Sequence, residues 1–326
     1  MAFFDKDMGA AALTFLVLYL IALIISVYIL VQRGIKSRFT FIAIVCLIRV
    51  GAQLSGVGFS IQGFEHYQWL IAYLILGAEG YFSIVLAAYH FVAVFETHVT
   101  GNSFLRPTLP LELKSGKGAR ASHNRFSWYL RHNTSLYFHF LLIPANVILI
   151  VGGTRTIGVP ADEWNTSHLV KEGKILRVVG QSIFLGGCVF ILAYAVRLRT
   201  AKKLSGAPLT AVLLAGPPLL VRGAFGIISA LVDDYNYYDF NNYGANGLKT
   251  KFLLGEYLMG ATMEYLATII LLLSHFSAFS KSEMKKASES REMSRWDLSS
   301  RDGTIDEPHT HSPKQSMKME EYGVRC

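Results

Sequence analysis

Seven long runs of apolar residues follow one another along the chain, separated by short polar segments. They fall at about residues 10–31, 39–61, 69–95, 136–153, 175–196, 208–232 and 252–275. A helix needs roughly 20 predominantly apolar residues to cross the hydrocarbon core of a bilayer. The pattern therefore predicts an all-α, polytopic membrane protein, a bundle of seven transmembrane helices within one domain, residues 1–280.

The pattern changes after residue 280, where the chain becomes polar, basic and rich in serine. Such a composition cannot bury enough apolar surface to fold, so we expect residues 281–326 to form a disordered cytosolic tail. Ser288, after two lysines, and Ser312, before a proline, are candidate phosphorylation sites, although any serine-rich tail contains such matches by chance. Phosphate there would weaken attraction to anionic lipid.

The basic residues between the runs predict the orientation. Thirteen lie in the segments after the first, third and fifth runs, and six lie on the opposite side of the predicted bundle. Loops rich in Lys and Arg stay in the cytosol. The N-terminus is therefore expected outside and the C-terminus inside, in the plasma membrane or an endomembrane of the secretory pathway. Asn165, in the sequon Asn165-Thr166-Ser167, then faces outward and is a candidate glycosylation site.

Overall composition adds one exclusion. The 326 residues are 52% hydrophobic, and the formal net charge is +8. The basic residues stand in short segments that flank apolar runs, as in membrane proteins, and not on one amphipathic face. We therefore expect membrane lipid as a partner and no nucleic acid; the oligomeric state is left open.

The candidate functional residues are ionisable groups within the apolar runs. Each unpaired charge at mid-membrane costs about 2.5–3.5 kcal/mol on insertion scales, so such groups are paired, functional or both. The predicted intramembrane polar site consists of Arg49, Glu79, Arg222, Glu256 and Glu264. Read functionally, these residues line an outward-facing cavity; read structurally, they are buried ion pairs that fix helix register.

Depth along the helices suggests how these charges pair. Arg49 is expected to meet Glu79, and Arg222 to meet Glu256 or Glu264. Because one arginine cannot satisfy both acids of the last helix, we expect one of them, Glu264, to carry a proton that is coupled to ligand movement.

Secondary candidates flank this site. They are Gln53, His90, Arg177 and Gln181. Arg177 is expected to extend to the outer membrane surface, and His90 to be an interfacial histidine nearer the inner face. The tyrosines between residues 233 and 247 are expected to anchor the helices at the headgroup level, with a ligand-covering loop as the alternative.

Several chemistries do not fit the sequence. The last run, 252–275, has no lysine for a retinal Schiff base. Neither the His and Asp ligands of a zinc hydrolase nor a Gly-x-Ser-x-Gly elbow or a phosphate-binding loop is present. We therefore expect no enzyme activity, no cofactor and no metal site.

Short segments of the chain resemble a known family. They are residues 47–51 (LIRVG), 76–80 (LGAEG), 217–222 (PPLLVR) and the acidic stretch 256–264. They are similar to a group of fungal seven-helix membrane proteins of unknown function, which implies the seven-helix fold without an activity. A more distant similarity is to fungal lipid-translocating exporters, which have a second arginine where this chain has Gly226.

Three functions are compatible with these observations. The intramembrane charges favour a transporter or exporter of an amphipathic small molecule. Seven helices, an aromatic loop and a serine-rich tail favour a receptor or sensor for a small-molecule ligand. A structural membrane protein needs only the packing signals.

Overall fold

The computed structural model describes residues 5–35, 37–107, 134–156, 159, 162–164, 166–244 and 247–277. The predicted tail, residues 281–326, lies outside these described residues. So do the candidate modification sites Asn165, Ser288 and Ser312.

Seven helical segments are long and apolar enough to cross a membrane, which confirms the seven predicted spans and the multi-pass membrane class. The first six are α1 (Lys6–Arg33), α2 (Phe39–Gln62) with η1 (Gly63–His66), α3 (Gln68–Thr100), α6 (Thr134–Thr154), α7 (His168–Thr200) and α8 (Ala207–Leu231). The seventh consists of α9 (Thr250–Gly255), a π-helical turn η4 (Glu256–Ala261), α10 (Thr262–Leu273) and η5 (Ser274–Phe276).

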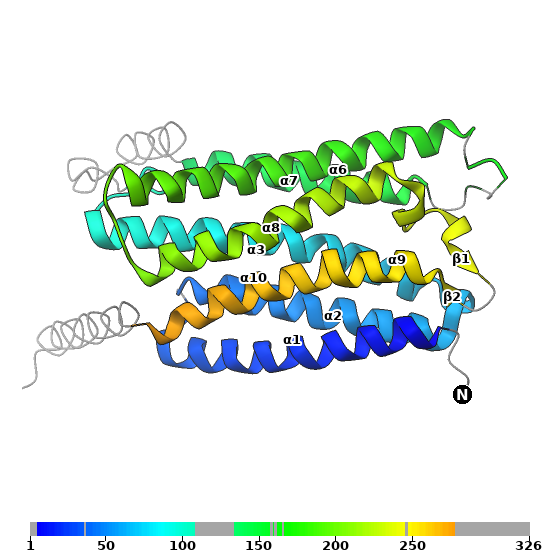
Figure 1. Ribbon diagram of the computed structural model, residues 1–326, viewed down its shortest axis with the longest axis horizontal. Helices are drawn as coiled ribbons and strands as arrows, with labels where there is room; N and C mark the ends of the chain where they lie inside the picture. The colour runs from blue at the N-terminus through cyan, green and yellow to red at the C-terminus, as the bar shows by residue number, and fades with distance from the viewer. Residues whose placement is uncertain are drawn as a thin grey trace, which may run out of the picture. The chain divides into compact units, whose positions relative to one another are not determined.

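The helices run side by side in one bundle (Figure 1). Helix α1 packs on α2 and α2 on α3, while α6 packs on α7 and α7 on α8. The seventh helix packs on α8 and also contacts α1, α2 and α3. Helix α3 contacts α6, α7 and α8, so it joins the two groups of helices.

Local sequence fixes several helix ends. The carboxylate of Asp5 accepts a hydrogen bond of 2.9 Å from the backbone N–H of Met8, which caps the start of α1. Helices α1 and α3 end at Gly34 and Gly101, whose φ angles of 80° and 77° favour glycine. Helix α8 has Pro208 in its first turn, and it continues unbroken through Pro217 and Pro218.

A folded loop lies between α8 and α9. It contains η2 (Asp233–Tyr235), η3 (Phe240–Asn242) and a small antiparallel hairpin of β1 (Tyr243–Gly244) and β2 (Gly247–Leu248). Asp5 also accepts a hydrogen bond of 2.7 Å from the backbone N–H of Leu248. This contact ties the start of α1 to the hairpin, and we call this end of the bundle the hairpin end.

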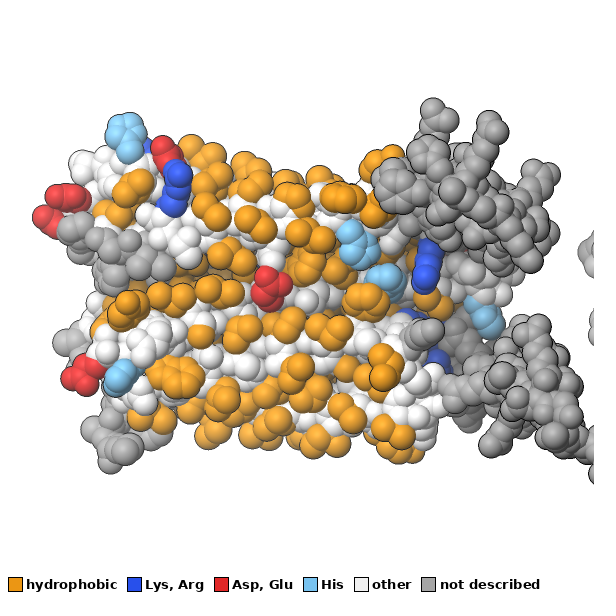
Figure 2. Space-filling model, turned by 180° about the vertical axis from the view of Figure 1, so that it is seen from behind, with side chains coloured by type: hydrophobic (Ala, Val, Ile, Leu, Met, Phe, Trp, Pro, Cys, Tyr) orange, Lys and Arg blue, Asp and Glu red, His pale blue; other side chains and the backbone are white. Residues whose placement is uncertain are grey.

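Two surfaces of the helices have different environments. Figure 2 shows a broad apolar belt along the bundle, interrupted by an acidic side chain midway and by histidines nearer one end. Ile24, Leu47 and Leu214 are more than 60% exposed on the isolated chain, as lipid-facing residues are. The inward faces form one large hydrophobic core, which includes Phe91 and Leu271, and a smaller core at the hairpin end around Tyr73.

Candidate functional site

A buried triad of charges lies at the centre of the bundle. Glu264 of α10 is fully buried, and Arg222 of α8 donates from Nε to its carboxylate at 2.5 Å. Arg49 of α2 donates to the other carboxylate oxygen from Nη2, and the same nitrogen donates to the carbonyl of Gly77 at 3.1 Å. One carboxylate therefore neutralises part of the charge of two guanidinium groups, and it ties three helices together.

Glycine on α3 makes room for this triad. A Cβ atom at Gly80 would lie 2.2 Å from Nε of Arg49, a separation that real side chains do not tolerate. Glycine at this position lets the guanidinium of Arg49 lie directly against the backbone of α3. The carbonyl of Gly77 and the space at Gly80 therefore position the guanidinium of Arg49.

The expected pairing of Arg49 with Glu79 is wrong, because Arg49 is bonded to Glu264. Glu79 is half-buried and accepts a hydrogen bond from the side-chain amide of Asn146, on α6. Both Glu79 and Glu264 lie at similar depths, about 16 and 21 Å along their helices at 1.5 Å per residue. Depth alone could not distinguish them, and the rotation of α3 about its axis decided the pairing.

Arg177 was expected to extend to the outer membrane surface; in the structure it is buried and bonded to the loop at the hairpin end. Its residue is 7% exposed, and it lies about 14 Å into α7 at the usual helical rise. It donates to the side-chain oxygen of Asn236 at 2.6 Å and to the carbonyl of Ser229 at 3.4 Å, and it lies 4.8 Å from the ring centre of Tyr238. All three partners are neutral, and no acidic group forms an ion pair with Arg177 among the residues described.

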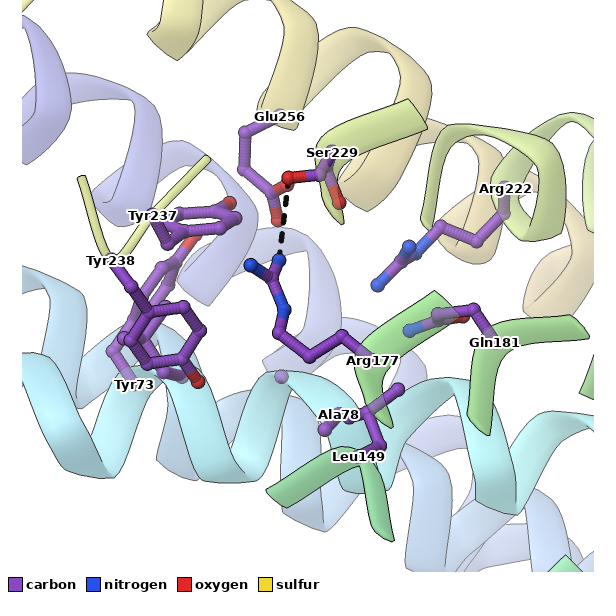
Figure 3. A pocket seen from close by; sticks show the side chains of 12 residues that line it. Tyr73, Ala78, Leu149, Arg177, Gln181, Arg222, Ser229, Tyr237, Tyr238 and Glu256 are labelled. Carbon is purple, nitrogen blue, oxygen red and sulfur yellow. Dashed lines mark hydrogen bonds between the residues drawn. The ribbon is translucent and has the colours of Figure 1, made fainter. Parts of the chain in front are cut away.

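Arg177 and Arg222 belong to the lining of a cavity, which lies in the half of the bundle toward the hairpin end (Figure 3). Its enclosed space is small, about 60 Å³, and the cavity is partly open. The side chains of Arg177, Arg222 and Gln181 point toward its middle, and Glu256 approaches from another side. The full lining is Tyr73, Leu74, Gly77, Ala78, Leu149, Arg177, Gln181, Arg222, Ser229, Tyr237, Tyr238 and Glu256.

The cavity therefore contains only part of the predicted site. Arg222 and Glu256 line it, as do the secondary candidates Arg177 and Gln181. Glu264 touches it only through Arg222, with which it is paired. The remaining predicted residues, Arg49 and Glu79, are not among the lining residues.

The tyrosine-rich loop contributes groups that the sequence did not single out as ligand-contacting. Tyr237 and Tyr238 line the cavity, and the ring of Tyr237 meets Phe252 edge to face with 4.6 Å between centroids. Burial raises the pKa of Tyr238, while Arg177 opposes that shift, so this hydroxyl stays protonated at neutral pH. For these two tyrosines the structure favours the alternative reading, a loop that covers a cavity.

Two polar atoms on the cavity wall have no partner within the described part of the chain. They are Oε1 of Gln181 and the hydroxyl of Tyr237, and both are buried. Buried polar groups are normally satisfied by protein, ordered water or ligand, and an unsatisfied one costs about 1–3 kcal/mol. Both atoms have almost no accessible surface, so they belong to the packed wall around the cavity.

The arginines near the cavity differ in their acidic partners. Arg49, Arg177 and Arg222 contribute three positive charges, because arginine stays protonated in proteins. Glu256 and Glu264 contribute at most two negative charges, and Glu79 lies apart with Asn146. Arg49 and Arg222 share Glu264, so among these three arginines Arg177 is the one without an acidic partner in the described residues.

The other secondary candidates lie away from the cavity lining. His90 stacks on Phe41 with 4.0 Å between ring centroids, and its ring lies 5.9 Å from that of His139. Gln53 is fully buried on α2, and neither of its side-chain amide atoms has a hydrogen-bond partner in the described chain. Neither residue contributes to the cavity wall.

A second polar network at the opposite end of the bundle was missed by sequence reasoning. The fully buried Glu96 of α3 accepts hydrogen bonds from Ser103, Tyr194 and Lys202 at 2.6–2.9 Å. Because its partners come from α7 and from two different loops, Glu96 fastens this end of the bundle. An acid near the end of a long apolar run, followed by basic loops, was the available signal.

Comparisons with protein-family models, with curated proteins and with solved structures give no match. The resemblance to fungal seven-helix proteins therefore remains an expectation, as does the lack of enzyme activity. Among the described residues no three His, Cys, Asp or Glu side chains are grouped so that they could hold a metal ion.

Proposed function

We propose that this membrane protein binds a small amphipathic anion in the cavity near the hairpin end and carries it across the bilayer. The observation that carries the proposal is Arg177, a buried cation on the cavity wall with only neutral partners in the described chain. An uncompensated buried charge is costly, so an anion at this position would be bound tightly.

The lining favours a ligand with both a charged and an apolar part. Arg177, Arg222 and Gln181 offer N–H donors, whereas Leu74, Leu149 and the tyrosine rings offer apolar contact. A guanidinium fork matches the geometry of a carboxylate, sulfonate or phosphate. This arrangement supports an anionic headgroup that carries an aliphatic or aromatic tail.

An interrupted helix and a proline pair beside the cavity support transport, although the helix with the prolines, α8, is itself unbroken. Helix α8 contains Pro217 and Pro218 one turn before Arg222, and the seventh helix contains the π-helical turn that begins at Glu256. Many transporters place their binding groups on broken helices near the middle of the bilayer, where such helices can change shape.

The proposed orientation places the hairpin end outside the cell or in the lumen, with the Lys- and Arg-rich loops in the cytosol. The cavity then faces the exterior. The plasma membrane or an endomembrane of the secretory pathway is the proposed location.

A receptor for the same anion is the second candidate. It is favoured by the packed hydrophobic core and the Glu96 network toward the opposite end of the bundle. In the conformation that the structure describes, the proposed binding site lies in the half of the bundle toward the hairpin end.

Binding can be tested with octanesulfonate, an amphipathic anion whose charge is constant, added to the purified protein in lipid nanodiscs. We expect saturable binding that Arg177→Gln weakens about 10- to 100-fold, the equivalent of about 1.5–3 kcal/mol for hydrogen bonds to a charged group. Arg155→Gln is the matched control, because Arg155 is an exposed arginine of the hairpin end that pairs with Glu172. Its affinity should equal that of the wild type.

Two outcomes would count against the anion site: equal affinity in Arg177→Gln and wild type, or equal binding of octyltrimethylammonium, a cation of similar length. Flux of octanesulfonate into proteoliposomes separates the two candidates. Flux that requires Arg177 supports a transporter, and binding without flux supports a receptor.

A further inference from the structure

Glu256 is an acid on the cavity wall whose charge the protein does not directly neutralise. The residue is 9% exposed, and no lysine or arginine forms an ion pair with it among the described residues. We propose that Glu256 binds a proton together with the anion, so that the cavity takes up the two as a pair. This inference rests on the proposed anion site.

The backbone places Glu256 in this position. It is the first residue of the π-helical turn Glu256–Ala261, and π-helical turns are frequent at functional sites. A Cβ atom at Gly260 would lie 3.1 Å from the carboxylate, so glycine there leaves space beside it. The carboxylate is thus held against its own helix and beside the cavity, away from the aqueous surface.

Each arginine near Glu256 forms its hydrogen bonds with residues other than Glu256. Arg49 and Arg222 are both bonded to Glu264, and Arg177 is bonded to Asn236 and Ser229. The titratable and charged groups that face Glu256 are Arg49 from α2, Tyr73 from α3, Arg177 from α7, Arg222 from α8, Tyr237 and Tyr238 from the loop, and Tyr257 from the same helix. None of the three arginines forms an ion pair with Glu256, so they act on its carboxylate only at a distance.

An anion in the cavity changes this balance. Its charge at Arg177 and Arg222 offsets the attraction that these groups exert on the carboxylate of Glu256. It also adds direct repulsion between two negative charges in a site of low water content. Protonation of Glu256 removes that repulsion, and therefore the anion and the proton strengthen each other's binding by linkage.

Glu264 is the weaker candidate for this role, contrary to the expectation from the sequence. Two guanidinium groups contact the carboxylate of Glu264. Protonation of Glu264 would break both ion pairs and leave Arg49 and Arg222 without an acidic partner. The structure thus reverses the expected roles of the two acids: Glu264 holds the arginines, and Glu256 is available to take a proton.

The direction of the pH dependence follows from this linkage. When Glu256 is protonated before binding, at low pH, the anion binds at full affinity. As the pH rises, Glu256 ionises, and binding then requires proton uptake. The affinity should therefore fall as pH rises, at most about tenfold per pH unit for one proton.

The test measures octanesulfonate binding to the wild type, Glu256→Gln and Glu65→Gln between about pH 4 and pH 8, a range that runs from the ordinary pKa of a glutamate to well above it. Glu65 is an exposed acid at the hairpin end and serves as the matched control. We expect the affinity of wild type and Glu65→Gln to fall with pH, and that of Glu256→Gln to stay flat and high. Uptake of protons from a weakly buffered solution, followed with a pH dye, should reach about one proton per bound anion in the wild type at the pH values where Glu256 is ionised before binding.

The outcomes distinguish this inference from the anion site on which it rests. Anion binding that needs Arg177 but takes up no proton would overturn the proton coupling and leave the anion site standing. Proton uptake that persists in Glu256→Gln would assign the proton to another group. No saturable binding by the wild type at any pH would overturn both proposals. Because proton uptake is measured on the wild type, the existence of proton coupling can be tested without a variant, and Glu256→Gln is needed only to assign the proton to Glu256.

Discussion

Glu264→Gln should destabilise the protein strongly, although the two side chains have nearly the same shape. The side chains of Glu264, Arg49 and Arg222 are 0%, 4% and 9% exposed, so water cannot replace the lost charge. Removing one partner of a buried pair costs about 3–5 kcal/mol, because it leaves an unpaired charge. Here one substitution leaves two guanidinium groups facing each other, so we expect the upper part of that range.

Glu79→Gln is the matched control for this substitution. Glu79 is an intramembrane glutamate of similar depth, but its partner is the neutral amide of Asn146. Glutamine can still accept that hydrogen bond, so the loss should be about 1 kcal/mol or less. Unfolding of both variants can be compared by far-ultraviolet circular dichroism during titration of mild detergent micelles with dodecyl sulfate.

A double-mutant comparison identifies the partner of Arg49. Arg49→Met combined with Glu264→Leu restores the net charge of the triad, so it should be less unstable than Glu264→Leu alone. Arg49→Met combined with Glu79→Leu should be close to the sum of its single substitutions. The reasoning is refuted if Glu79→Gln costs as much as Glu264→Gln, or if Glu79→Leu, and not Glu264→Leu, compensates the loss of Arg49.

Two further predictions concern packing and orientation. Gly80→Ala should lower stability, because its Cβ would overlap the guanidinium of Arg49, whereas Gly186→Ala, with no atom within 4 Å, should be neutral or slightly stabilising in the same unfolding assay. Equal effects of the two substitutions would contradict the close contact. Expression in a glycosylating host should give a glycosidase-sensitive shift that Asn165→Gln removes. Asn133→Gln should leave it in place, because the sequon Asn133-Thr134-Ser135 lies in a segment expected in the cytosol; a shift that depends on Asn133 would reverse the orientation.

The sequence by itself determined the seven membrane-spanning helices. Their apolar runs are long enough to cross a bilayer, and this one-dimensional property does not depend on which helices are neighbours. The sequence also determined that the buried charges are exceptional, because an arginine or glutamate within an apolar run needs a partner wherever the helix lies. Arg222 and Glu264 were accordingly among the expected pairings, and the structure joins them.

Only the tertiary structure decided which charges meet and which remain available. Arg49 could have met Glu79 or Glu264 at a similar depth, and the choice depends on the rotation of α3 and on the space that Gly80 leaves. Arg177 was free to extend to the membrane surface until the loop after α8 supplied Asn236 as a neutral partner inside the bundle.

The π-helical turn at Glu256 and the inward position of Tyr237 likewise arise from packing. A π-helical turn shifts backbone hydrogen bonds by one residue and leaves the apolar pattern of the sequence almost unchanged. A tyrosine has an apolar ring and a polar hydroxyl, so it suits a membrane interface and the wall of a cavity equally well. The positions of residues along the chain fix depth in the membrane, but the direction in which each side chain points within the bundle is set by contacts between helices that are distant in sequence.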